Sequence, residues 1–554
     1  MQLKPSEFEC ESLGPFAVLA EQRSTAPVVP SVEAIAMHRL AFGPRPGDVA
    51  NMRKIGFERW VKDQLKAPLD DGDVVAAKLA NATLHIEYEE NINGKQVKLK
   101  EDRKLTALTK TRAELWSLTK DGTPWAEKVR PVEETRSATI IRAVHSPWQL
   151  REVLVDFWHN HFNVNAYVDE DRARVLWPIY DRDVIRKNAL GNFRTLLESV
   201  STSAPMLYYL NNAASKSGPA NENFARELFE LHTLGRPAYL SNQYRKWSDV
   251  PGAREGKSAG YIDEDVYEAA RAFTGWTMAV GRWTGRGDER LPNTGDFHYF
   301  EGWHDSYQKR VLGTEIESHQ PEMKDGQMVL DLVGYHPATA RYICTKLVRR
   351  LVADDPPKAL VDRAVKVWID NQKSPDQIAR VVETIALSAE FRSTWGQKVK
   401  RPFEVIAAFL RATEAEINPQ PDLLWMMYSY GQPLFQWPLP TGFPDESGHW
   451  LGTLSWLQRW NMPIFLTADW QKSARVKMPR TVPSGAKTFR EVARASVIQM
   501  LGYMLADPVI EVFSKFIAGD RSPDEALDPS DGGFVERFNR LELLIAMTPD
   551  FHYR

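Results

Sequence analysis

A single helix is predicted at residues 221–235, which read NENFARELFELHTLG. Asn221 can cap its first turn, and Gly235 can end it. At about 100° per residue, one side of this helix carries polar residues and the other carries apolar ones. The polar side consists of Glu222, Asn223, Arg226, Glu227 and Glu230, and the apolar side of Phe224, Ala225, Leu228, Phe229 and Leu231. The stretch therefore predicts a helix that packs one face against a core.

The polar face is a ladder of Glu222, Arg226 and Glu230, spaced four residues apart. If it is exposed, each pair contributes about 0.2–0.5 kcal/mol. If it is buried, the same residues form an ionic site and are candidates for catalysis. His232 points to the apolar side, about 200° from Glu230, so a regular helix cannot direct both side chains at one metal ion.

A second predicted helix, ending near Asn163, carries another polar stripe. Glu152, Asp156, His159 and Asn163 follow one another at spacings of four, three and four. A histidine beside carboxylates suits a tuned general base or a metal ligand, so Asp156, His159 and Asn163 are candidate catalytic residues, with His159 and Asp156 as candidate metal ligands. The alternative is a solvated polar face. His161 points the other way, and we expect it to be a hydrogen-bonded core residue.

Two irregular segments hold further candidates. The first, from about residue 277 to residue 313, carries His304 and Asp305, and long aromatic loops of this kind are often functional. The second, at residues 431–444, is too rich in proline for regular structure. We predict that the stripe, the ladder and the His304-Asp305 loop converge on one cavity, which the loop between Gln432 and Trp450 helps to close. Trp276, Gln432 and Trp450 are the candidate substrate-binding residues.

Composition limits the classes of function. The 554-residue chain is 43% hydrophobic and 26% charged, and its net charge of −3 gives no electrostatic case for nucleic acid. Two cysteines exclude a disulfide framework. The absence of an apolar run of about 18 residues predicts no transmembrane segment. Without a recognisable leader the expected location is cytoplasmic as written, or exported to the periplasm if an export signal has been removed.

The predicted fold is mainly α. Repeated capping signals and helical periodicity predict a large multi-helix domain with irregular loops. Alternating apolar residues on both sides of Asn93-Gly94 predict a small β-hairpin insertion. We expect an N-terminal arm at residues 1–30, a helical main domain at 31–420, and a C-terminal loop and helical region at 421–554 packed on the main domain.

A series of motifs spans nearly the whole chain: Ala41-Phe42-Gly43-Pro44-Arg45-Pro46-Gly47, Phe157-Trp158-His159-Asn160-His161-Phe162, Asn221-Glu222-Asn223, Glu230-Leu231-His232-Thr233-Leu234-Gly235, Ala270-Arg271-Ala272-Phe273-Thr274-Gly275-Trp276, His304-Asp305, His336-Pro337-Ala338-Thr339-Ala340-Arg341 and Gly431-Gln432-Pro433. In these motifs the chain resembles the large bacterial family catalogued as domain of unknown function number eighteen hundred. The resemblance implies a mainly helical fold. It also implies export, and a partner from a family that resembles sulfatases or alkaline phosphatases.

Three functions fit these patterns. The first is an enzyme with a His/carboxylate polar site between helices, which acts as a hydrolase or oxidoreductase on a small polar substrate. In one version of this hypothesis the enzyme depends on a divalent metal. The second is a metal-free carbohydrate-active enzyme that uses paired carboxylates on a glycan. The third is a non-catalytic binding or assembly protein.

Overall fold

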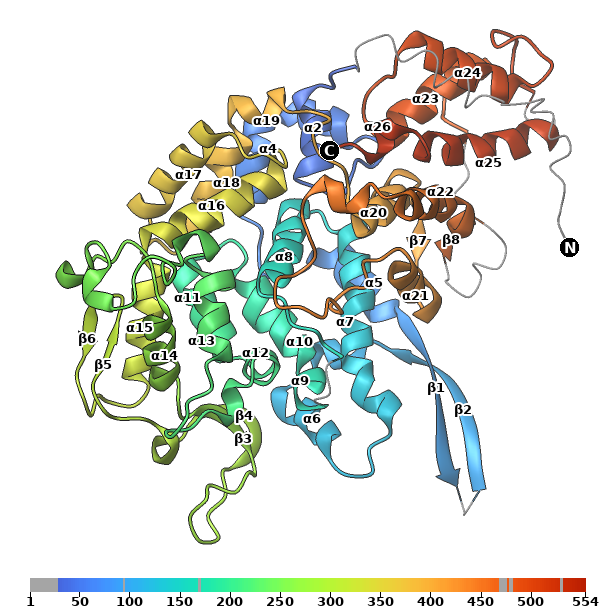
Figure 1. Cartoon of the computed structure of the whole chain (residues 1–554). Coiled ribbons are helices and arrows are strands. Elements are labelled where there is room, and N and C mark those ends of the chain that lie inside the picture. The colour runs from blue at the N-terminus through green and yellow to red at the C-terminus, as the bar shows by residue number, and fades with distance from the viewer. Residues whose placement is uncertain (1–27, 93–94, 168–170, 468–475, 478–481, 529–531) are drawn as a thin grey trace, which may run out of the picture.

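The computed structural model describes residues 28–92, 95–167, 171–467, 476–477, 482–528 and 532–554. Within these ranges the chain is mainly α-helical, as predicted, with 25 α-helices and only small two-stranded sheets (Figure 1). The helices up to residue 272 are α2 (Val32–Arg39), α3 (Asp48–Ile55), α4 (Phe57–Gln64), α5 (Gly72–Asn81), α6 (Arg112–Trp116), α7 (Trp125–His145), α8 (Gln149–His161), α9 (Asp171–Val175), α10 (Trp177–Ile179), α11 (Phe193–Ser201), α12 (Ala204–Tyr209), α13 (Asn223–Glu227) and α14 (Asp263–Ala272). The later helices are α15 (Lys324–Gly334), α16 (Pro337–Leu351), α17 (Lys358–Asp370), α18 (Gln377–Ala386), α19 (Ala389–Ser393), α20 (Pro402–Ala412), α21 (Pro421–Ser429), α22 (Thr453–Thr467), α23 (Phe489–Leu501), α24 (Asp507–Ala518), α25 (Gly532–Ala546) and α26 (Pro549–His552).

The strands form four antiparallel pairs in the described part of the chain. They are β1 (Thr83–Ile92) with β2 (Lys95–Lys104), β3 (Trp276–Val280) with β4 (Asn293–Tyr299), β5 (Lys309–Val311) with β6 (Thr314–Ile316), and β7 (Glu416–Ile417) with β8 (Val476–Lys477). The first pair confirms the predicted hairpin, and it projects away from the helices in Figure 1. Ile92 lies opposite Lys95, and the predicted turn residues between them are outside the described ranges.

The stretch from 221 to 235 is helical, but it is not one regular α-helix. After α13 the chain widens into a π-helix at Leu228–His232. The Gly235 amide donates to the Phe229 carbonyl at 2.9 Å, which closes the wide turn, and Gly235 has a φ of 84°. The predicted apolar face is confirmed, because Phe224, Leu228 and Phe229 are all buried. Side-chain directions after Leu228 therefore depart from the regular helical geometry assumed in the prediction.

One hydrophobic cluster includes Ala34 near the start of the described chain and Phe551 near its end. Residues on both sides of position 420 share this core, so the boundary between the 31–420 and 421–554 regions stays a prediction. Residues 1–27 of the predicted N-terminal arm lie outside the described ranges. No helix in the described part of the chain combines the length and the apolar character needed to cross a bilayer.

Candidate functional site

The stripe predicted from Glu152 to Asn163 lies on α8 and in the residues that follow it. Glu152, His159 and Asn163 are buried, and the Asp156 side chain is 13% exposed. The alternative of a solvated polar face is therefore wrong. The stripe does not act as one group, because its members bond to different partners.

Asp156 belongs to a buried ion cluster. Its carboxylate accepts hydrogen bonds from Arg350 at 3.0 Å and from Arg401, both of which are almost completely buried. Arg350 also pairs with Glu404 at 2.9 Å. Two guanidinium groups engage the Asp156 carboxylate, so it has structural partners, and its role as a metal ligand or catalytic acid stays a prediction. Among the described residues, no group of three or more His, Cys, Asp or Glu is arranged to hold a metal ion.

His159 joins a second buried network. Its Nε2–H group donates to Asp181 Oδ1 at 3.0 Å, and Asp181 also pairs with Arg142 and Arg186. Burial favours the neutral acid, but Arg186, His159 and Arg142 together hold the pKa of Asp181 well below its ordinary value. The cavity beside His159 measures only about 30 Å³, which is about the volume of one water molecule. The prediction that His159 faces a substrate pocket therefore needs correction.

Two asparagines hold the proline-rich loop against the end of α8. Asn163 donates to the carbonyl groups of Trp437 and Leu439 at 3.1 and 2.7 Å. Asn160 donates to the Phe443 carbonyl at 2.8 Å and accepts from the Phe443 amide at 2.7 Å. These bonds hold the loop over the end of α8, where Figure 1 shows it as the orange connection between α21 and α22.

The predicted ladder is divided between surface and interior. Arg226 pairs with Glu222 at 2.9 Å and with Asp263 at 3.1 Å, and all three side chains are between 38% and 55% exposed. The exposed interpretation therefore holds for Glu222 and Arg226. Glu230 is half-buried, and its charge adds to the effect of burial in raising the pKa of Tyr342 to about 12. Only this last member of the ladder acts electrostatically on the site described below.

The His304-Asp305 loop forms its own network. His304 Nε2 lies 3.2 Å from Asp325 Oδ2, and Lys309 pairs with the same oxygen at 2.6 Å. Asp305 accepts two hydrogen bonds from Arg271, at 2.8 and 3.0 Å. Neither of the two cavities beside α8 is lined by these loop residues or by the ladder. The prediction of one cavity shared by all three groups is therefore wrong for these cavities.

The three predicted substrate-binding residues are buried, and each contacts other parts of the protein. Trp276 is fully buried and packs edge-on against Phe273, so it cannot stack on a substrate. Trp450 is 3% exposed, and its indole N–H donates to the Pro444 carbonyl at 2.9 Å. Gln432 is buried, and its Oε1 atom accepts from the Phe403 amide at 3.0 Å. Trp450 and Gln432 therefore brace the loop, and neither offers a binding group to solvent.

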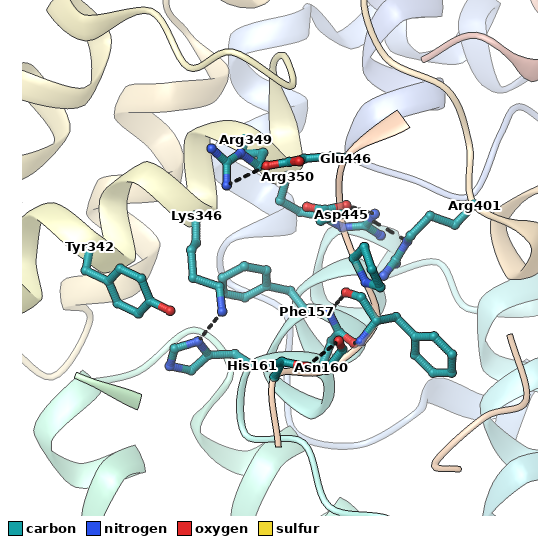
Figure 2. Close-up of a pocket in the computed structure, with 14 residues that line it drawn as sticks. Phe157, Asn160, His161, Tyr342, Lys346, Arg349, Arg350, Arg401, Asp445 and Glu446 are labelled. Atoms are coloured by element: carbon teal, nitrogen blue, oxygen red, sulfur yellow. Dashed lines mark hydrogen bonds and ion pairs between the residues drawn. The ribbon is translucent and has the colours of Figure 1, made fainter. Parts of the chain in front are cut away.

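A larger cavity of about 290 Å³ lies between α8, α16 and residues 441–446, and we call it the α8–α16 cavity. It is lined by Phe157, Asn160, His161, Tyr342, Lys346, Arg349, Arg350, Arg401, Thr441, Gly442, Phe443, Pro444, Asp445 and Glu446. Figure 2 shows Tyr342, Lys346 and His161 with their polar ends turned toward one another. Most of the lining side chains are polar or charged, and a cavity of this size has the dimensions of a small-ligand site.

Lys346 and His161 form the central pair of the α8–α16 cavity. Lys346 Nζ donates to His161 Nδ1 at 3.0 Å, and His161 Nε2–H donates to the His232 carbonyl at 3.1 Å. Since a carbonyl oxygen only accepts, the proton of His161 lies on Nε2 and the lone pair on Nδ1 faces the amine. Burial and the Lys346 charge hold the pKa of His161 well below its ordinary value. His161 is therefore a neutral acceptor.

The amine of Lys346 is the unbalanced charge of this cavity. Arg349 pairs with Glu446 at 3.3 Å, and the two other lining arginines have acidic partners in the Asp156 cluster. Lys346 forms no ion pair with any carboxylate in the described ranges, and its described hydrogen bond goes to neutral His161. Burial lowers the pKa of Lys346 from 10.5 to about 8, despite the opposing effect of Asp445.

Sequence reasoning missed Lys346, Tyr342 and Asn160. Tyr342, Lys346 and Arg349 recur at spacings of four and three on α16, which is the same signal that pointed to the stripe on α8. The run of cations at the end of this helix is equally typical of a favourable C-terminal turn, so the spacing alone does not indicate a site. His161 is buried and hydrogen-bonded, as expected, but it is not only a core residue, because it lines the α8–α16 cavity and contacts Lys346.

Comparison with known proteins gives one match. The model of the family described as Protein of unknown function (DUF1800) matches residues 35–553. No curated protein and no solved structure matches the chain. The matched residues include every residue that lines the α8–α16 cavity. The description of the family names no activity, so a proposal about function has to rest on the geometry of the site.

Proposed function

This chain belongs to the DUF1800 family, and we propose that it is an enzyme that performs acid–base chemistry on a small, negatively charged polar substrate in the α8–α16 cavity. Lys346 is the residue that binds the charge and moves the proton, and His161 is the residue that orients it. Of the hydrolytic and redox reactions that the sequence leaves open, hydrolysis fits best, because the proton transfers that it needs are those that Lys346 can supply.

The observation that carries this proposal is the contact between a partly buried lysine and a neutral histidine. A buried ammonium group is costly unless an opposite charge faces it. His161 supplies a hydrogen bond but no charge, and every lining arginine already has an acidic partner. An anionic substrate would supply the missing charge. The cavity thus favours a carboxylate, phosphate or sulfate ester over a neutral or cationic molecule.

The same geometry suits proton transfer. A lysine with a pKa of about 8 is present in both protonation states near neutral pH, which is the condition for an efficient general acid or base. His161 keeps its lone pair toward the amine, because the His232 carbonyl engages the opposite ring nitrogen. Tyr342 stays protonated, since burial and Glu230 raise its pKa to about 12, so its hydroxyl is a hydrogen-bond donor for the substrate.

The proposal is tested with a panel of chromogenic carboxylic, phosphate and sulfate esters. We expect turnover of at least one ester by the wild-type protein and a loss of about 100-fold or more in Lys346→Met, which is the usual contribution of an acid–base residue. Lys366→Met is the matched control, because Lys366 is an exposed lysine that pairs with Asp370 at the surface. Turnover that survives in Lys346→Met would contradict the proposal.

A binding protein without catalysis is the second candidate, since the missing counter-charge predicts an anion whether or not chemistry follows. Calorimetry with inorganic phosphate, sulfate and small carboxylates would then show binding that Lys346→Met abolishes, without turnover of any ester. The resemblance implies export and a sulfatase-like or phosphatase-like partner, and both fit either candidate. Such a partner would release sulfate or phosphate, which are anions that the cavity favours. Co-purification of a tagged chain from its source would test that association.

A further inference from the structure

We propose that a second site, a groove between the hairpin, α7 and α21, binds a carbohydrate chain. The groove measures about 460 Å³ and is lined by β1 residues, by the first turns of α7 and by one face of α21. We call it the aromatic groove, after Trp125, Trp425 and Tyr428, which line it. It shares no lining residue with the α8–α16 cavity, so the proposal is independent of the proposed function.

The aromatic side chains are unusually accessible. Trp125, Trp425 and Tyr428 are 60%, 67% and 62% exposed, although large aromatic residues are mostly buried in folded proteins. Trp425 and Tyr428 are three residues apart on α21 and therefore share a face of the helix. Neither indole N–H nor the Tyr428 hydroxyl has a hydrogen-bond partner among the described residues. The groove thus offers flat apolar surfaces with unused polar edges.

Polar side chains complete the groove. Glu133 accepts from Arg136 at 3.1 Å and also from the Tyr167 hydroxyl, and its side chain is 21% exposed. Gln436 lines the same groove from the proline-rich loop. A carboxylate and an amide present acceptors and donors in fixed planes, which is what neighbouring hydroxyl groups of a sugar require. The charged side chains that line the groove already have partners: Glu133 pairs with Arg136, Arg130 with Glu134 at 3.1 Å and Glu87 with Lys100 at 2.5 Å. The groove therefore does not select a charged ligand.

The groove is held in place before any ligand arrives. Arg136 Nη2 donates to the Leu424 carbonyl at 3.3 Å, which ties α21 to α7, and Ser137 donates at 3.3 Å to the carbonyl of Pro419, which lies just before α21. The Arg174 guanidinium lies 4.3 Å from the centroid of Trp125, which restrains the orientation of that ring. A preformed site avoids the entropic cost of ordering aromatic side chains on binding.

A carbohydrate fits these features better than a peptide helix does. A pyranose ring has one apolar C–H face for stacking and a rim of hydroxyl groups for hydrogen bonds, which matches exposed aromatic rings beside a carboxylate and an amide. An amphipathic peptide helix would need a continuous apolar groove, and here ion-paired Glu133 and Arg136 interrupt it. The occupant we assign is therefore an uncharged oligosaccharide or polysaccharide.

The test is affinity gel electrophoresis of the full chain in gels that contain laminarin, xylan, mannan, dextran, hydroxyethylcellulose or glycol chitin, followed by calorimetry with the matching oligosaccharide. At least one polysaccharide should retard the wild-type protein. Trp425→Ala and Tyr428→Ala should each weaken binding by at least tenfold, whereas Trp425→Phe, which keeps a ring, should weaken it less. Trp283→Ala is the matched control, because Trp283 is 52% exposed and does not line the groove.

Failure of all six polysaccharides to retard the wild-type protein would overturn the proposal, and so would unchanged binding by Trp425→Ala and Tyr428→Ala. Equal loss of binding in Trp283→Ala would overturn it as well, because the effect would then not belong to the groove. Lys346→Met should bind the glycan like the wild type. If glycan binding fails while Lys346→Met still abolishes ester turnover, only the inference about the groove is lost.

Discussion

Lys346 Nζ lies 3.0 Å from His161 Nδ1, and both residues line the α8–α16 cavity. The two residues are 185 positions apart in the sequence and come from α16 and α8. His161 remains neutral, so this contact gives the amine a direction without giving it a counter-charge. An anion that binds in the cavity would therefore contact an ammonium group whose orientation His161 already fixes.

The charge of Lys346 should make stability depend on pH. Burial lowers its pKa from 10.5 to about 8 in the folded protein. Below pH 8 both the folded and the unfolded state carry the proton, and the folded state bears the full cost of burying the charge. Between about pH 8 and 10.5 only the folded state releases the proton, and this cost disappears. The free energy of unfolding of the wild type, relative to Lys346→Met, should therefore rise by about 1–3 kcal/mol from pH 7 to pH 10.

Urea denaturation of both proteins at the two pH values measures this difference. A Met side chain of similar length keeps the packing and removes the titration, so the comparison isolates the amine. A difference in unfolding free energy that stays constant with pH would show that Lys346 titrates normally.

Asp156 should behave as a structural residue. Asp156→Ala removes one buried acidic partner from both Arg350 and Arg401, which then keep only Glu404 and Asp445. The loss of one member of a buried ion pair costs up to about 3–5 kcal/mol. Glu222→Ala removes one partner of an exposed pair with Arg226 and should cost less than about 1 kcal/mol. Urea midpoints of both variants check this contrast; equal midpoints would contradict the assignment of Asp156 to a buried cluster.

His159 and His161 should have opposite effects on ligand binding. His159→Ala removes a donor to Asp181 and should cost about 1–3 kcal/mol of stability while leaving anion binding intact. His161→Ala removes the acceptor that directs Lys346, and the affinity for phosphate or sulfate should fall by about tenfold.

Calorimetric titration with phosphate, together with thermal melts of both histidine variants, separates the two effects. Loss of phosphate binding in His159→Ala with binding retained in His161→Ala would reverse the assignment and favour the stripe on α8 as the site.

The sequence predicts local features well and the site only in part. Helical periodicity and capping signals predict the mainly α fold, and the Asn-Gly pair between alternating strands predicts the hairpin, because each depends on residues close in the chain. The sequence also identifies the polar stripe on α8, but it leaves open whether the stripe is buried or solvated, and the structure shows that it is buried. The sequence does not identify the partners of the stripe, since Asp156 pairs with Arg350 and Arg401, residues that lie 194 and 245 positions away.

The errors have a common physical cause. A row of acids and histidines marks a polar face of a helix, but the chemistry of that face depends on which opposite charges the fold places next to it. Guanidinium groups from α16 and the start of α20 engage Asp156, and Asp181 engages His159, so both residues have buried partners that the sequence did not indicate. Lys346 was left without such a partner, and the sequence held no sign of this because the absence of a long-range contact has no local pattern.

The last prediction concerns Gly235, which lies beneath the Tyr342 ring. Its φ is 84°, and a Cβ atom at this position would lie 2.5 Å from Cδ2 of Tyr342. Gly235→Ala should therefore have two costs: about 1–3 kcal/mol for a backbone conformation (φ 84°, ψ 157°) that only glycine adopts readily, and a further cost for displacing the Tyr342 ring, which lines the cavity. Gly122→Ala is the matched control, because Gly122 has the same φ of 84° and no neighbouring atom within 4 Å of its Cβ position. In urea denaturation Gly122→Ala should show only the backbone cost, while Gly235→Ala should lose more stability and also weaken phosphate binding; equal losses and unchanged binding would mean that Tyr342 is not held in place by Gly235.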